Sequence, residues 1–187
     1  MKIGFDSIEH ELLKHLIYSN TRDVNKLWNI VLSKDNKLDK IRKISSEERM
    51  ENIDLFKFHS LIADDEDFDT SIRISFDNVF PCIRDGYSIY VSIEVITKAS
   101  NDKYYLNDDI PYSKSSILAN LLYKIFDEFK IEGIGTLKFN QEGNCGNIRK
   151  EYYSSSPSNC YKYIGASIKL GILLPGTKTI KDEYTYR

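Results

Sequence analysis

An alternation of apolar and polar residues in the middle of the chain predicts its central strands. In YSIYVSIEVIT, residues 87–97, every second residue is apolar, which is typical of a strand with one buried face. SIRISF, residues 71–76, alternates in the same way, and Asp85-Gly86 between the two segments is a turn signal. We therefore predict an antiparallel hairpin connected across residues 77–86. Residues 161–173 alternate as well and predict a last strand.

A helical repeat of apolar residues lies between these strands, from Ser113 to Lys130. Its apolar positions recur at steps of one, three and four and form one wide stripe: Ile117, Leu118, Leu121, Leu122, Ile125, Phe126 and Phe129. Ser113 is a suitable N-cap, and Gly133 and Gly135 predict the end of the helix and a turn into a strand at residues 134–139. The flanking residues 101–111 and 140–159 are predicted to be loops.

Three shorter helices are predicted in the first 60 residues. They are a helix at residues 6–19 that begins with a capping box of Asp6 and Glu9, a second helix that Thr21 caps, and a third from Ser45 to about Asp54. Trp28, the only tryptophan, is expected to anchor the second helix in the core. The polar residues 33–44 read as a loop, and residues 55–70 as a strand or an extended linker that ends in an acidic loop.

These elements predict an α+β fold. We expect one domain at residues 1–176, mostly helical at 1–60, with a mainly antiparallel sheet and the long helix at 71–172. The helix Ser113–Lys130 should pack on one face of the sheet, and the N-terminal helices should lie at one edge. Pro175-Gly176 ends the last strand, so residues 177–187 form a separate C-terminal arm.

Charge and cysteine content narrow the classes of function. The net charge is −2, which disfavours a general electrostatic nucleic-acid binder. The charge is uneven: residues 1–60 carry 11 basic and 10 acidic side chains, residues 61–110 carry 4 and 11, and residues 111–187 carry 11 and 7. Three cysteines without a CxxC spacing argue against a disulfide framework or a zinc ribbon and favour a reducing compartment. The N-terminus does not read as a signal peptide, and no apolar run reaches the roughly 20 residues of a membrane span.

The acidic residues 64–69 are the first candidate for chemistry. They are Asp64, Asp65, Glu66, Asp67 and Asp69, and three of them have the spacing of a calcium loop. Thr70 and Phe76 stand where that loop needs Gly and Glu, so a solvated acidic loop is the preferred reading. The three histidines do not have metal-ligand spacing, and no catalytic or cofactor motif is found. We therefore predict neither an enzyme nor a cofactor.

Several segments together resemble a known family. They are HLIYSNTRDVNKLW, SSEERMENI, SIRISF, YSIYVSIEVIT, SILANLLYKIFDEF, GIGTLKF and YIGASIKLGIL, which span about residues 10–172. In order and character this series resembles the neck and tail-completion proteins of tailed bacteriophages, of the head-to-tail connector or tail-terminator type. The composition, rich in Lys, Asn, Ile and Tyr, is similar to that of crAss-like phages.

The resemblance implies a non-enzymatic virion protein with a tail-terminator-like fold. Such proteins form twelvefold or sixfold rings between the portal and the tail, contact other neck and tail proteins, and let DNA pass through the lumen without binding it specifically. An acidic segment at residues 64–69 suits a conduit wall, because a negative wall does not hold a passing polyanion. No membrane is involved, and the protein would be made in the bacterial host cytoplasm.

The C-terminal arm is the predicted candidate for contact between subunits. Ile180, Tyr184 and Tyr186 would be anchors on a neighbouring subunit, with Arg187 and the terminal carboxylate at the rim. A frayed terminus is the alternative reading of this arm. For the whole chain, the alternative function is a non-catalytic adaptor or regulatory binding module that recognises a peptide at a sheet edge.

Overall fold

The structure is a computed structural model, which describes residues 5–38, 40–58, 68–82, 86–106, 110–139, 149–153 and 162–175. Its helices are α1 (Phe5–Tyr18), α2 (Arg22–Val31), α3 (Ser46–Glu51) and α4 (Lys114–Phe126), with short 3-10 turns η1 (Ile53–Leu55) and η2 (Ala99–Asn101). Its strands are β1 (Phe56–Phe58), β2 (Thr70–Cys82), β3 (Gly86–Lys98), β4 (Lys103–Tyr105), β5 (Pro111–Ser113), β6 (Lys130–Ile131), β7 (Gly135–Lys138), β8 (Arg149–Tyr153) and β9 (Tyr163–Pro175).

A seven-stranded, mostly antiparallel sheet forms the centre of the fold. The strand order is β1-β2-β3-β9-β7-β6, and β8 pairs with the first part of β9, away from β7, which pairs with β9 at Gly171 and Ile172. The predicted hairpin is confirmed, since Ile72 pairs with Val95 and Ile74 with Ile93. β2 runs on to Cys82, so the connection predicted at residues 77–86 is too long. The pairing shifts register after Asp77, and such a bulge lets a ladder continue past an irregular stretch.

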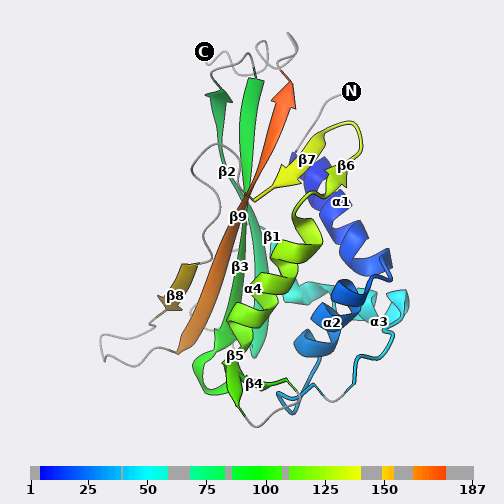
Figure 1. Cartoon of the computed structure of the whole chain (residues 1–187), viewed down its shortest axis with the longest axis vertical. Helices are drawn as coiled ribbons and strands as arrows, with labels where there is room; N and C mark the ends of the chain where they lie inside the picture. Colours follow the sequence, from blue (N-terminus) through cyan, green and yellow to red (C-terminus); the bar gives the residue numbers. More distant parts are fainter. Residues whose placement is uncertain are drawn as a thin grey trace.

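The four α-helices of the described residues lie on one side of the long strands, as Figure 1 shows. α4 contacts β3 and β9, and α2 contacts α4. The indole ring of Trp28 on α2 packs against Phe56 of the edge strand β1, at 5.1 Å between centroids. The core between these layers includes the alternating residues of β3 and β9: Ile89, Val91, Ile93, Val95, Ala166, Ile168, Leu170 and Ile172. The mixed α+β class with a mainly antiparallel sheet is thus confirmed, and so is the burial of Trp28.

Helix boundaries agree with the sequence where a side-chain cap begins the helix. Thr21, Ser45 and Ser113 each accept a hydrogen bond from the backbone N–H three residues later, as N-caps do. The predicted capping box of Asp6 and Glu9 is wrong, because α1 already begins at Phe5 and a cap residue precedes the first turn.

The long helix is shorter than its apolar pattern predicts. α4 ends at Phe126, and Glu128 adopts a left-handed φ of 63°. The chain then reverses because the N–H of Glu128 donates to the carbonyl of Leu137 and the N–H of Leu137 donates to the carbonyl of Phe129. Phe129 still packs against the core, but from this turn and not from the helix.

Two segments that the sequence predicts to be loops contain strands. β4 and β5 pair within residues 101–113, with Tyr104 opposite Tyr112. Tyr104 is fully buried, which explains why this polar segment adopts a fixed structure. β8 lies within residues 140–159 and pairs with β9 from Arg149 opposite Ser167 to Tyr153 opposite Tyr163. The segment at residues 55–70 contributes β1, which pairs in parallel with β2.

Candidate functional site

An exposed, positively charged loop connects α2 to α3. Residues 33–43 carry five basic and two acidic side chains, a net charge of +3, and the structure describes all of them except residue 39. The basic side chains are all exposed: Lys34, Lys37, Lys40, Arg42 and Lys43. Ile41 stands among them with 37% of its surface exposed. We call residues 33–43 the basic loop.

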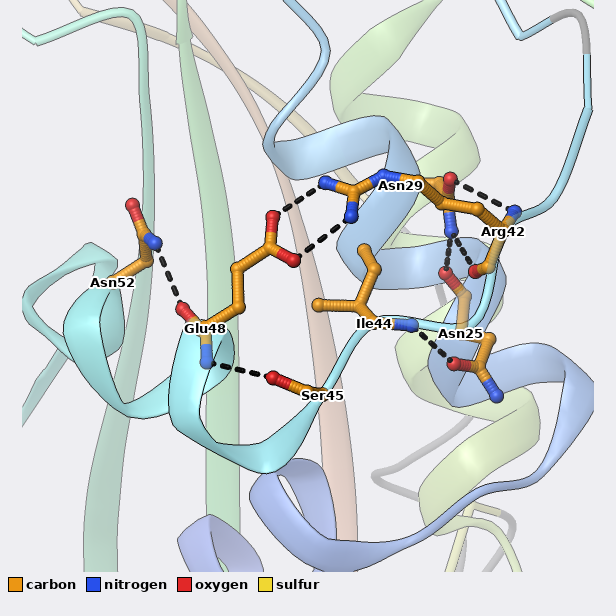
Figure 2. Close-up of polar contacts among 7 residues, drawn as sticks. All are labelled: Asn25, Asn29, Arg42, Ile44, Ser45, Glu48 and Asn52. Carbon is orange, nitrogen blue, oxygen red and sulfur yellow. Dashed lines mark hydrogen bonds and ion pairs between the residues drawn. The ribbon is translucent and has the colours of Figure 1, made fainter.

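Two asparagines of α2 fix the second half of the basic loop (Figure 2). The side-chain amide of Asn29 donates to the carbonyl of Arg42 at 2.8 Å, and its side-chain oxygen accepts from the backbone N–H of Arg42 at 3.2 Å. One helical turn earlier, the side-chain oxygen of Asn25 accepts from the N–H of Ile44 at 3.3 Å. Asn25 and Asn29 therefore hold residues 42–44 along the helix much as a neighbouring strand would.

An ion pair and a helix cap secure the loop where it enters α3. The guanidinium of Arg42 makes a bidentate ion pair with the carboxylate of Glu48, as Figure 2 shows. The hydrogen bond from Nη1 to Oε2 is 2.8 Å long. The hydrogen bond with Arg42 lowers the pKa of Glu48, and the same bond raises the pKa of Arg42. The side chains of Arg42 and Glu48 are 57% and 34% exposed, so solvent screening limits the pair to about 0–1 kcal/mol. The pair orients Arg42 more than it stabilises the fold.

The first half of the basic loop is tied to β4. The N–H of Leu38 donates to the carbonyl of Tyr105 at 3.0 Å, and the N–H of Tyr105 donates to the carbonyl of Asn36 at 2.9 Å. Leu38 is buried, as is Ile44 at the other end. Anchored at both halves, the described part of the loop holds its backbone in place while its basic side chains are exposed.

A buried arginine holds together the helices that support the loop. Arg49 of α3 is 1% exposed, and its Nη1 donates to the carbonyls of Leu16, Ile17 and Ser19 at the end of α1, at 3.2, 2.9 and 2.6 Å. Its Nη2 donates to the side-chain oxygen of Asn25 at 2.8 Å. Burial lowers the pKa of Arg49. Because the last carbonyls of a helix have no partner within it, this cation caps α1 and joins three helices.

A second buried polar cluster joins the basic loop to the start of α4. Lys114 is 2% exposed, and its Nζ donates to the side-chain oxygen of Asn36 at 3.4 Å. Asp102 accepts from the N–H of Ser115 and from the hydroxyl of Thr97, both at 2.8 Å. Burial lowers the pKa of Lys114, and the negative charges of Asp69 and Asp102 oppose that shift. Lys114 is enclosed, so the cluster is structural. Of the two features, the basic loop is the one whose side chains a partner can reach.

No match is found when the sequence is compared with protein-family models and with curated proteins.

The predicted site residues fall mostly outside the described part of the chain. Of the acidic residues, Asp64, Asp65, Glu66 and Asp67 lie outside it. Asp69 is described; its side chain is exposed and accepts a hydrogen bond from the side-chain amide of Asn101 at 2.8 Å. The predicted arm residues Ile180, Tyr184, Tyr186 and Arg187 also lie outside the described residues.

Within the described residues, the structure brings together no group of three or more His, Cys, Asp or Glu that could hold a metal. None of the described helices is both long and apolar enough to cross a membrane. His15 is half-buried against Phe129, with 4.5 Å between ring centroids, and burial lowers its pKa.

The sequence interpretation missed the basic loop as a site, although a signal was present. The sequence predicts only a polar loop at residues 33–44. Over residues 1–60 the basic and acidic side chains nearly balance, which conceals the local positive charge. A shorter window would have shown five basic side chains in eleven residues. The fixed backbone, however, depends on Asn25, Asn29 and Tyr105, which no local pattern identifies.

Proposed function

We propose that this protein is a structural component of a bacteriophage neck or tail that assembles into a closed ring through which DNA passes. Its place would be the virion, and its neighbours would be portal, neck and tail proteins. The family resemblance over about residues 10–172 suggests this role. A twelvefold or sixfold ring follows from the same resemblance, and the proposed role requires no catalysis.

The observation that carries the proposal is the presence of two oppositely charged segments in one chain. A ring is built from head-to-tail contacts, so each subunit must offer two unlike surfaces that complement each other. The basic loop carries a net charge of +3, and residues 64–69 carry five acidic side chains and no basic one.

The arrangement of helices also supports a tail-terminator-like fold. α4 contacts β3 and β9, and the contact of Trp28 with Phe56 brings α2 to the edge strand β1. These contacts fit the expectation of a long helix on one sheet face and N-terminal helices at one edge.

Size-exclusion chromatography with light scattering tests the proposed function. Because the phage neck and tail proteins that this chain resembles form sixfold or twelvefold rings, we expect an assembly of six or twelve subunits. Electron micrographs should show a ring with a central opening. A protein that stays at one or two subunits at all concentrations would contradict the ring.

A peptide-binding adaptor is the second candidate, since one sheet edge is partly open. β1 pairs with β2 only at Ile72–Ile74, and no other described strand pairs with the outer edge of Asp77–Cys82. Pro81 removes one N–H donor from β2, which weakens this edge as a docking strand. An extended peptide that binds the monomer and is displaced by changes at this edge would favour the adaptor.

The C-terminal arm provides a separate test of subunit contact. If Ile180, Tyr184 and Tyr186 anchor the arm on a neighbour, deletion of residues 177–187 should leave folding intact and abolish assembly. Unfolding by urea and the mass from light scattering are the two measurements. Assembly of the truncated chain at full efficiency would assign the arm no such role.

A further inference from the structure

We propose that the basic loop is the docking surface for the acidic segment, residues 64–69, of a second copy of this chain. This inference rests on the proposed ring and names the contact that would join its subunits. It places the acidic segment between subunits and not on the wall of the lumen.

The geometry of the loop favours a protein partner that it meets in one fixed orientation. Both halves of its backbone are held, by Asn25 and Asn29 on one side and by Tyr105 on the other. A surface fixed in this way does not lose backbone freedom when it binds, and this lowers the cost of association. Four of its exposed basic side chains are lysines, and Ile41 offers an apolar contact at their centre.

Charge complementarity identifies the partner. The region at residues 61–110 carries 11 acidic and 4 basic side chains, and five of the acids fall within the six residues 64–69. A partner with this chemistry is always present at the same concentration, because it is the same chain. Opposite charges on two segments of one chain also steer copies toward one another.

A nucleic acid is the competing occupant, and the loop suits it less well. The loop contains only one arginine, and two acidic residues, Asp35 and Asp39, stand between its basic residues. No aromatic side chain stands in it for base stacking. The whole chain is negatively charged, which weakens the general attraction of phosphates.

Charge reversal with complementation tests the inference. The loop-reversed variant carries Lys34→Glu, Lys40→Glu and Lys43→Glu, three exposed side chains at the surface of the loop. The segment-reversed variant carries Asp64→Lys, Asp65→Lys and Asp67→Lys. A matched control, Arg22→Glu, Lys124→Glu and Lys130→Glu, makes the same change in net charge at exposed positions elsewhere.

We expect each reversed variant alone to raise the Kd of self-association at least about tenfold at low ionic strength, with the control close to wild type. The two reversed variants mixed together should assemble again, because every loop then meets an opposite charge on its neighbour. The difference in Kd between each reversed variant and the wild type should shrink in about 1 M salt, where the Debye length falls to about 3 Å. Sedimentation velocity measures the assemblies, and urea unfolding checks that each variant is folded.

The outcomes separate this inference from the proposed function. A wild-type protein that never assembles overturns both. A wild-type ring that the loop-reversed variant still forms with unchanged Kd overturns the docking role alone. Reversed variants that do not recover on mixing would show that loop and segment do not meet between copies. Loss of binding to a short DNA duplex with unchanged self-association would assign the loop to nucleic acid.

Discussion

Replacement of Arg49 by methionine should destabilise the fold strongly, although the residue lies on a short helix of only six residues. Arg49→Met keeps an unbranched side chain in the buried site and removes all four hydrogen bonds of the guanidinium. The carbonyl of Leu16 keeps a donor, the indole N–H of Trp28 at 2.8 Å. The side-chain oxygen of Asn25 keeps the N–H of Ile44.

The carbonyls of Ile17 and Ser19 then lose the donor that caps them at the end of α1. An unsatisfied buried acceptor costs about 1–3 kcal/mol; the contact at Ile17 is buried and that at Ser19 is only partly buried, so the two together give about 1–6 kcal/mol. Removal of a buried cation returns part of this, since burial already lowers the pKa of Arg49. We therefore expect a loss of about 1–4 kcal/mol in the free energy of unfolding.

Urea denaturation followed by tryptophan fluorescence is a direct assay. Trp28 is the only tryptophan, is fully buried, and shares the carbonyl of Leu16 with Arg49, so the probe lies beside the changed residue. Arg42→Met is the control, because its pair with Glu48 is exposed and should contribute about 0–1 kcal/mol. A loss for Arg49→Met no larger than that of the control, at an unchanged m-value, would refute the capping argument.

Three further predictions concern other parts of the fold. Leu121→Ala on α4 should cost about 2–5 kcal/mol, because Leu121 is 5% exposed within the core; an unchanged denaturation midpoint would mean that this helix face is not packed. Asn29→Ala should cost about 1–2 kcal/mol and speed amide exchange at Arg42, and unchanged exchange would contradict the attachment of the basic loop. Lys114→Met should flatten the pH dependence of stability in the alkaline range. The folded pKa of Lys114 lies below its unfolded value, so between the two values the unfolded state binds more protons and wild-type stability rises with pH. Equal slopes of stability against pH in wild type and variant would exclude this contribution.

The sequence predicted the elements whose signals are local. The period of two in residues 71–76 and 87–97 matches the β2–β3 register, because one buried face requires an apolar residue at every second position. The caps Thr21, Ser45 and Ser113 act within three residues, so their pattern is complete in the sequence. The placement of Trp28 in the core follows from its size and helical spacing.

Tertiary contacts decided what the local pattern left open or suggested wrongly. The stripe through Phe129 continues at helical spacing, yet α4 stops at Phe126 because the following residues pair with β7. β4 and β8 form in polar segments because β5 and β9 supply partners for their backbone groups. Burial of Arg49 and Lys114 could not be predicted from residue type, since both are usually exposed.

The basic loop shows the same division most clearly. The charge of the basic loop can be counted from the sequence, since exposed lysines and arginines are positively charged whatever the fold. Its fixed backbone comes from Asn25, Asn29 and Tyr105, and Tyr105 lies more than 60 residues away along the chain. Charge is a property of single residues and can be read from the sequence, whereas rigidity depends on hydrogen-bond partners that only the folded chain brings together.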